Sequence, residues 1–294
     1  MGPTALRRLF ALCLLGGLSA AALSAQAASP VWAVRGAHNT VYLAGSIHML
    51  PANDATLPAA FDRAYADSSK LVMEIDLGKL DPLEAVTWMM DHSALPPGST
   101  LRTVLGQQRY QHLSAAAASL GQSMTAFEGQ APWLVGIEIT ELAYTHEGFD
   151  PEQGVEEQLV RRAQSDGKPT AGLETVSEQL GGLTTLSSED QVRMLDLTVD
   201  ELKDVKSETH EVTDAWRHGD AARLAALLST EYNTLPSLYK PLVTDRNQRW
   251  LPQLEQLLKA NDNALVVVGA LHLVGPGGLI ELLRKKGYRI TQLE

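Results

Sequence analysis

The chain has 294 residues, a formal net charge of −11 and a single cysteine. The excess of acidic residues argues against nucleic acid and anionic membrane surfaces as partners, because both of these carry negative charge. The length is sufficient for one large α/β domain with a hydrophobic core of its own.

The first 27 residues have the features of a secretory signal peptide. Arg7 and Arg8 form a positive region, an apolar stretch runs from Leu9 to Leu23, and Ala25-Gln26-Ala27 is a small-x-small cleavage site. An uncleaved membrane anchor is the alternative, but the apolar stretch is short and rich in glycine, alanine and serine. We therefore expect an exported protein, periplasmic or secreted, that does not remain inserted in a membrane after cleavage.

The only cysteine, Cys13, lies within this predicted signal peptide. The mature chain, residues 28–294, then has no thiolate that could form a disulfide, act as a nucleophile or bind a metal ion. Its formal charge moves to −13, because two arginines are removed with the signal peptide.

The beginning of the mature chain predicts a βαβ unit. Residues 32–34 and 41–44 have the pattern of a strand hairpin, residues 57–68 keep the apolar spacing of a helix, and residues 71–75 follow as a strand. The strands at 41–44 and 71–75 are expected to pair in parallel, connected by a right-handed crossover.

Helical patterns dominate the middle of the chain, and strands return near its end. After the first unit the predicted elements are helices over 82–166, a strand over 170–173, helices over 188–260, a strand over 264–268, a helix over 277–286 and a strand over 288–293. These elements predict an α/β fold in one domain, residues 28–294, with a central, mostly parallel sheet flanked by helices. The ranges of about 82–166 and 188–260 are expected to be large helical insertions.

Two strands end in the same short motif, about 220 residues apart. The run from Val41 leads into Gly45-Ser46-Ile47-His48, and the run from Val266 leads into Gly269-Ala270-Leu271-His272. In open α/β sheets, ligands and catalytic groups collect at the carboxyl ends of the strands. Each histidine alone is typical of a satisfied polar residue, but the matched pair indicates one shared functional site.

Two carboxylates are expected at the same edge of the sheet. Glu74 interrupts an otherwise apolar strand, and burying a carboxylate is costly unless it is paired or bound to a cation. A salt bridge to an arginine is the structural alternative for Glu74. Glu174 ends the short strand at 170–173, and its structural alternative is a helix N-cap or first-turn acid.

This set of side chains is typical of a metal site. Two histidines with one or two carboxylates and no cysteine suit Zn, Mn, Co or Fe and argue against Cu(I). A hydrolytic metal lowers the pKa of a water molecule, and a second carboxylate can act as general base. Glu74 could be either a metal ligand or the general base.

Arg246 is the predicted cationic member of the site. It forms a polar pair with Asn247 in the predicted helix from Leu242 to Leu257. Its guanidinium would hold an anion or a polarised carbonyl, whereas a surface arginine is the alternative.

Five segments of the chain together resemble the TraB/GumN family, which includes the Tiki-type metalloproteases and is related in fold to the erythromycin-esterase and ChaN-like group. These are the two Gly-x-x-His segments, Met73-Glu74-Ile75-Asp76, Gly172-Leu173-Glu174-Thr175 with Glu178-Gln179, and Asp245-Arg246-Asn247.

The resemblance spans almost the whole mature chain. It implies an α/β fold and, in the Tiki branch, a protease dependent on Mn or Co that uses both motif histidines and a glutamate. These residues are here His48, His272 and Glu74. The chain departs from the family in having Gly154-Val155-Glu156 where relatives often have Gly-Val-Asp, which leaves Glu156 without an assigned role.

Three functions follow as hypotheses. The first is an exported metal-dependent hydrolase, a peptidase acting on a peptide or protein, with Mn, Co or Zn held by His48, His272 and Glu74. In it, Glu74 or Glu174 is the base and Arg246 the oxyanion partner. The second is a non-catalytic envelope protein of the same fold that binds haem or a metal ion. The third is a structural role in envelope or exopolysaccharide assembly with a vestigial site.

Overall fold

The computed structural model describes residues 28–294 with the exception of residue 235. The predicted signal peptide lies outside the described residues. The strands are β1 (Val31–Arg35), β2 (Thr40–Ser46), β3 (Leu50–Pro51), β4 (Lys70–Met73), β5 (Phe149–Asp150), β6 (Thr170–Gly172), β7 (Ala264–Gly269) and β8 (Arg289–Gln292).

Helices fill most of the chain between these strands. They are α1 (Ala59–Asp67), α2 (Pro82–Ser93), α3 (Leu101–Leu105), α4 (Gln107–Ser119), α5 (Pro132–His146), α6 (Val155–Asp166), α7 (Val176–Thr184), α8 (Ser188–Glu201), α9 (Val205–Arg217), α10 (Ala221–Thr234), α11 (Pro236–Tyr239), α12 (Asp245–Lys259), α13 (Ala270–Leu273) and α14 (Leu279–Lys285). Short 3₁₀ turns lie at Met124–Ala126 and Pro151–Gln153, and a π-helical turn at Lys240–Thr244 precedes α12.

A six-stranded sheet forms the centre of the fold, in the order β6-β4-β7-β2-β1-β8. The strands β6, β4, β7 and β2 run in parallel, whereas β1 pairs antiparallel with both β2 and β8. The predicted α/β class with a mostly parallel sheet is therefore confirmed, as is the predicted hairpin of β1 and β2.

The predicted pairing of β2 with β4 is wrong, although the two strands are parallel. Strand β7, from the far end of the sequence, lies between them and pairs with both. Five successive residues of β7, 264–268, are completely buried. A strand that is apolar on both faces is favoured at the centre of a parallel sheet, where helices cover both sides.

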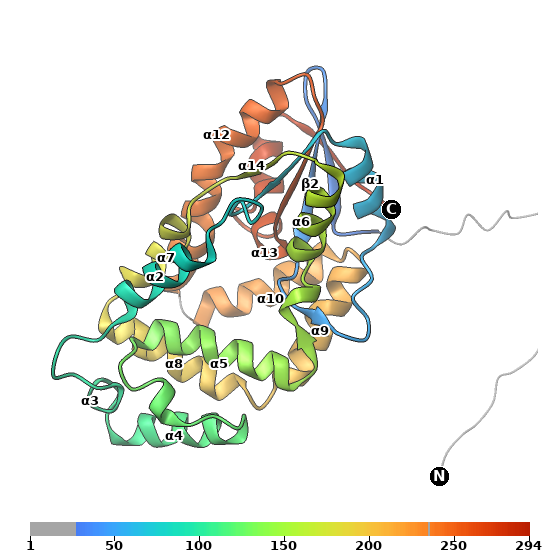
Figure 1. The fold of residues 1–294 in the computed structure, drawn as a ribbon. Coiled ribbons are helices and arrows are strands. Elements are labelled where there is room, and N and C mark those ends of the chain that lie inside the picture. Colours follow the sequence, from blue (N-terminus) through green and yellow to red (C-terminus); the bar gives the residue numbers. More distant parts are fainter. Residues whose placement is uncertain (1–27, 235) are drawn as a thin grey trace, which may run out of the picture.

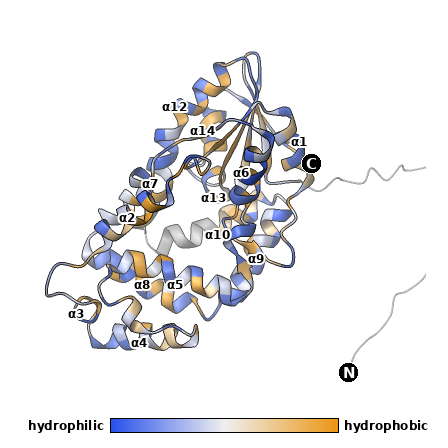
Figure 2. Cartoon of the chain, in the orientation of Figure 1, coloured by the Kyte–Doolittle hydropathy of each residue, from blue (hydrophilic) through white to orange (hydrophobic). Residues whose placement is uncertain are grey.

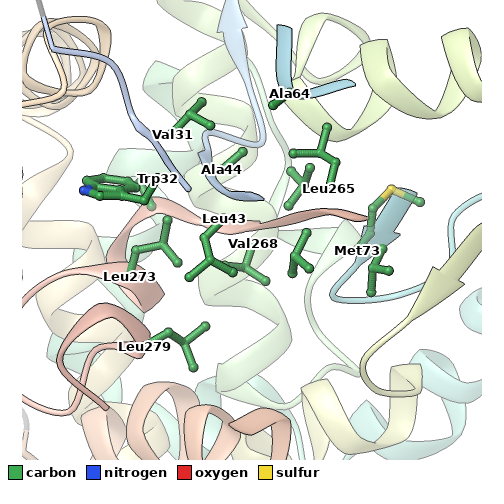
Figure 3. Close-up of a cluster of buried hydrophobic side chains, with 14 of the residues drawn as sticks. Val31, Trp32, Leu43, Ala44, Ala64, Met73, Leu265, Val268, Leu273 and Leu279 are labelled. Carbon is green, nitrogen blue, oxygen red and sulfur yellow. The ribbon is translucent and has the colours of Figure 1, made fainter. Parts of the chain in front are cut away.

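Helices cover both faces of this sheet. In Figure 1, α12 and α14 lie on one side of the strands, and α1 and α6 lie on the other. The strands carry strongly hydrophobic residues (Figure 2). Leu43 of β2 and Val268 of β7 pack with Leu273 and Leu279 in the core beside the sheet (Figure 3). Burial of this apolar surface is the main term that stabilises the sheet and its covering helices.

A second hydrophobic cluster lies within the helical part of the chain. It is formed by residues of α3, α4, α5 and α8, with Leu113, Ile139 and Leu195 each almost fully buried. Helix α5 packs along α8 (Figure 1). None of the helices in the described part of the chain is long and apolar enough to cross a membrane.

Candidate functional site

The four parallel strands deliver four of the predicted residues to one edge of the sheet. Glu74 directly follows β4, and Glu174 follows β6 by two residues. His48 follows β2 by two residues, and His272 lies in α13, which begins directly after β7. As expected, these four residues lie at the carboxyl edge of the sheet.

Glu74 is buried and is held by three different donors. Its Oε1 accepts a hydrogen bond of 2.7 Å from the backbone N–H of Gly269, and its Oε2 accepts one of 2.8 Å from Gln179 Nε2. The third donor is Arg246 Nη2, which forms an ion pair with Oε2. Burial alone would raise the pKa of Glu74, but the positive charges of Arg246 and His48 and the hydrogen bond from Gly269 N–H lower it to about 2.

Arg246 joins both carboxylates to His272. Its Nε and Nη2 donate to Glu174 Oε1 at 2.9 Å and 2.5 Å, and its Nη1 lies 3.0 Å from His272 Nε2. Only 8% of the Arg246 side chain is exposed, so the alternative of a surface arginine is wrong. The salt bridge that was the structural alternative for Glu74 is present in this arrangement.

The end of β6 and the start of α7 fix Glu174 and Gln179. Thr175 caps α7 by accepting from Glu178 N, and the Glu178 side chain accepts in turn from Thr175 N, which makes a capping box. Glu174 thus precedes the helix and is not its N-cap. Trp250 Nε1 donates to Glu174 Oε2 at 3.1 Å, so both oxygens of this carboxylate are engaged by α12.

His272 is held as the neutral tautomer with its proton on Nδ1. Asn247 donates through Nδ2 to the carbonyl groups of His272 and Gly277, so its Oδ1 is the acceptor for His272 Nδ1–H at 2.8 Å. The Nε2 lone pair then faces the N–H of Arg246. Burial lowers the pKa of His272 to about 4, with Arg246 adding to the effect.

His48 has a different environment, although its motif is the same. Its Nδ1 pairs with Glu156 Oε1 at 2.9 Å, and Ser46 Oγ donates to the same oxygen at 2.5 Å. The charge of Glu156 raises the pKa of His48 to about 9. The His48 side chain is 68% exposed, and its Nε2 has no hydrogen-bond partner among the described residues.

The start of α6 approaches His48 closely because Gly154 has no side chain. A Cβ at Gly154 would lie 2.1 Å from the carbonyl oxygen of His48. Next to it, Val155 N–H donates to Ile47 O at 3.1 Å, which places Glu156 beside the histidine ring. The Gly-Val-Glu segment is therefore part of the site, a role that the sequence left unassigned.

A pocket of about 330 Å³ lies at this edge of the sheet. His48 and Glu74 line it, together with Glu156, Glu157 and Gln179. Its apolar wall consists of Met73, Ile75, Leu77 and Pro151. Of the predicted residues, Glu174, Arg246 and His272 are buried next to Glu74 and do not line the pocket.

Comparison with known proteins identifies the family. The model of the TraB/PrgY/gumN family matches residues 30–292. The chain belongs to this family. The predicted resemblance is thereby confirmed over almost the whole described chain.

Curated relatives within this family are of similar length. The chain is 27% identical over 256 residues to the uncharacterized protein YbaP of Escherichia coli K12, and equally to YbaP of Shigella flexneri. Each match covers 83% of this chain and 87% of the relative. No solved structure matches the chain.

His48, His272 and Glu74 are side chains of the types that bind metal ions, but in the structure they are not arranged around a common point as metal ligands are. His272 Nε2 and His48 Nε2 are each oriented by a hydrogen bond or ion pair at the other ring nitrogen, as in metal-binding histidines. In the described ranges, however, no group of three histidine or carboxylate side chains could hold a metal ion. His272 Nε2 lies 3.9 Å from Glu74 Oε1, and both side chains contact the guanidinium of Arg246.

Five contributing side chains were not assigned a role from the sequence: Ser46, Glu156, Gln179, Asn247 and Trp250. The first four are in segments quoted for the family resemblance or for its one departure, and Trp250 lies outside them. Asn247 was noted only as the neighbour of Arg246. Their roles depend on contacts between distant elements, and a single sequence carries no direct signal for such contacts.

Proposed function

We propose that this chain is an exported, metal-dependent hydrolase and that its substrate is a peptide or protein. The observation that carries the proposal is the meeting of strand-end side chains beside one pocket, with His48 and Glu74 in the pocket wall.

A divalent ion, Mn, Co or Zn, would be held by His48, His272 and Glu74 in an arrangement that differs from the described one, in which Arg246 contacts both Glu74 and His272. Such an ion would supply Lewis acidity and a nucleophile at neutral pH. Asn247 keeps the Nε2 lone pair of His272 free of a proton, and Glu156 fixes the ring of His48. Arg246 is the proposed partner for negative charge that develops on the substrate carbonyl.

The pocket favours Glu74 over Glu174 as the general base. Glu74 lines the pocket, and its low pKa keeps it ionised over the whole neutral range. Glu174 is 2% exposed at its side chain and is engaged by Arg246 and Trp250. In this proposal Glu174 therefore positions Arg246 and does not contact substrate.

The test compares wild type with His48→Ala, His272→Ala and the control His146→Ala, whose histidine is exposed and distant in sequence from both motifs. Each protein is dialysed against an excess of Mn²⁺, and bound metal and peptide cleavage are both measured. We expect the wild type and the control to retain metal and to cleave, and both motif variants to lose metal and turnover. Full metal content in either motif variant contradicts the ligand assignment.

Haem or metal binding without catalysis is the second candidate, and it is favoured by the exposure of His48. Once the ring has lost its proton, its exposed Nε2 would be accessible to a planar ligand from solvent. A Soret band that forms when haem is added to the wild type, and is absent from His48→Ala, supports this candidate. Metal-dependent peptide cleavage by a colourless preparation excludes it.

A further inference from the structure

The pocket at the carboxyl edge of the sheet has two chemically different sides. The end of β4 and the segment after it supply the apolar side chains of Met73, Ile75 and Leu77. The first turn of α6 supplies Glu156 and Glu157. A ligand that fits this pocket therefore needs an apolar part and a part that interacts with carboxylates.

Glu157 is the carboxylate of this pocket that has no counter-charge. Glu74 is paired with Arg246, and Glu156 is paired with His48. Glu157 is half-buried and forms no hydrogen bond or ion pair with any other residue that the structure describes. Among the described residues, no lysine or arginine side chain lines the pocket. The pocket therefore favours a ligand that is positively charged.

Two further side chains of the pocket have acceptors without a donor. Glu156 accepts from Ser46 and His48 at Oε1, whereas its buried Oε2 has no hydrogen-bond partner in the described part of the chain. Only 7% of Glu156 is exposed, and leaving a buried carboxylate oxygen unpaired is costly. Gln179 donates through Nε2 to Glu74, so its Oε1 is the free end of the amide and accepts from no described residue. Both acceptors require a donor that the described residues do not supply.

We propose that this pocket binds a primary ammonium group of a peptide, with Glu157, Glu156 Oε2 and Gln179 Oε1 as the acceptors. The proposal names the substrate class of the proposed function and rests on the peptide substrate given there. An ammonium group has three N–H donors and no acceptor, which matches a set of acceptors that lack donors.

A lysine side chain fits both sides of the pocket. Its aliphatic stem can lie on the apolar wall while its charged end reaches the carboxylates of α6. The amino terminus of a peptide has the same charged group without this stem. The experiment therefore has an arm for each source of the ammonium group.

The test measures binding of synthetic pentapeptides to the wild type by calorimetric titration, with EDTA present so that no metal-dependent cleavage occurs. The first peptide is blocked at both ends and has one central lysine. The second has norleucine in its place, which keeps an aliphatic side chain and removes the charge. The third has a free amino terminus and no lysine.

We expect the lysine peptide to bind about tenfold to a hundredfold more tightly than the norleucine peptide. Preference for the first or the third peptide over the second supports the proposal and identifies the source of the ammonium group. Equal binding of all three peptides, or no binding of any of them, overturns it.

The variants Glu157→Gln and Glu152→Gln separate the pocket from the general negative charge of the chain. Glu152 is the matched control, because it precedes α6, is exposed and does not line the pocket. We expect Glu157→Gln to reduce the preference for lysine over norleucine at least about threefold, and Glu152→Gln to leave it within about twofold of the wild type. A merely structural role of Glu157 would weaken both peptides alike, and an unchanged preference in Glu157→Gln overturns the proposal.

The wild type alone keeps the proposal testable if Glu157→Gln does not fold. Rising NaCl should weaken binding of the lysine peptide and leave the norleucine peptide nearly unaffected, because salt screens the charge interaction. Equal responses of the two peptides to salt overturn the proposal.

Cleavage of the same peptides with Mn²⁺, Co²⁺ or Zn²⁺ is measured in parallel and tests the proposed function separately. Cleavage without any preference for an ammonium group overturns this inference and leaves the hydrolase in place. An ammonium preference without cleavage leaves this inference in place and contradicts the hydrolase.

Discussion

The two motif histidines differ in charge at neutral pH because their neighbours differ: His48 is protonated and His272 is neutral. His48 lies beside the ionised Glu156, which favours its protonated form. His272 is buried, with Arg246 at its Nε2 and the side-chain oxygen Oδ1 of Asn247 at its Nδ1, which favours its neutral form. The chemical role of each histidine is therefore set by residues outside its motif.

The pH dependence of the two rings should differ in sign. His48 has a pKa above the unfolded value of 6.5, so its contribution to stability is complete below pH 6.5 and is lost as the pH rises through about 9. His272 has a pKa below 6.5, so its contribution is present above pH 6.5 and is lost as the pH falls through about 4. Ring NMR signals should show these two separate titrations, and a joint titration near pH 6.5 would contradict the assigned environments.

Asn247 should be essential for the orientation of His272. The Asn247→Ala substitution removes the acceptor for Nδ1–H and leaves the buried carbonyl groups of His272 and Gly277 without this donor. We expect a loss of about 1–3 kcal/mol in the free energy of unfolding, measured with urea. Asn261→Ala, at an exposed position after α12, is the control and should change stability by less than about 0.5 kcal/mol. A similar loss in both variants would contradict this role.

At the scale of the elements, the two Gly-x-x-His motifs are similar in sequence but differ in how their glycines are packed. A Cβ at Gly45 would lie 3.1 Å from the Cα and Cβ of Ala270, which begins α13. At Gly269 the nearest atoms to a Cβ are Glu74 Oε1 at 3.4 Å and His272 Cδ2 at 3.5 Å, which is ordinary contact. Only the first glycine is required for a close approach between a strand and a helix.

The matched substitutions Gly45→Ala and Gly269→Ala test this difference. Gly45→Ala should lower the free energy of unfolding by about 1–3 kcal/mol, because the backbone of α13 must move away from β2. Gly269→Ala should change it by less than about 0.5 kcal/mol. Urea unfolding of both variants measures the difference, and equal effects would contradict the packing described for β2 and α13.

Much of the arrangement of the strands and their ends was predictable from the sequence. Alternating and continuous apolar runs predicted the strands, and glycine at each strand end predicted where the histidines leave the sheet. The shared motif predicted that the ends of β2 and β7 meet at one site, but it did not predict that the two strands pair directly with each other, as they do. The contact of Glu156 with His48 was not predictable, because it depends on how closely α6 approaches the loop after β2.

At the scale of the whole molecule, the chain has separate hydrophobic clusters for the sheet and for the helical part. The residues of the site are attached to the sheet cluster, through β2, β4, β7 and α12. The helical cluster of α3, α4, α5 and α8 includes none of the site residues described above. The order of the sheet strands could not be predicted, because β7 enters between β2 and β4 from a distant part of the sequence.

This separation predicts that damage to the helical cluster leaves the site intact. Leu195 of α8 is 1% exposed, and Leu195→Ala should cost about 2–5 kcal/mol of unfolding free energy. The control is Leu83→Ala, because Leu83 of α2 is 73% exposed and its truncation should cost less than about 0.5 kcal/mol. In both variants the titrations of His48 and His272 should match the wild type, and a shift in Leu195→Ala would contradict the separation.

We propose that the carboxyl edge of the sheet hydrolyses peptides through Glu74 and the two motif histidines. The most direct test of this proposal is cleavage of a defined peptide mixture, followed by mass spectrometry, with wild type and Glu74→Gln in the presence of Mn²⁺, Co²⁺ or Zn²⁺. Glu74→Gln keeps the size of the side chain and removes the charge, and its folding is checked by thermal unfolding. We predict metal-dependent cleavage by the wild type and none by folded Glu74→Gln. Equal cleavage by both proteins, or no cleavage by the wild type with any of the three metals, would contradict the account.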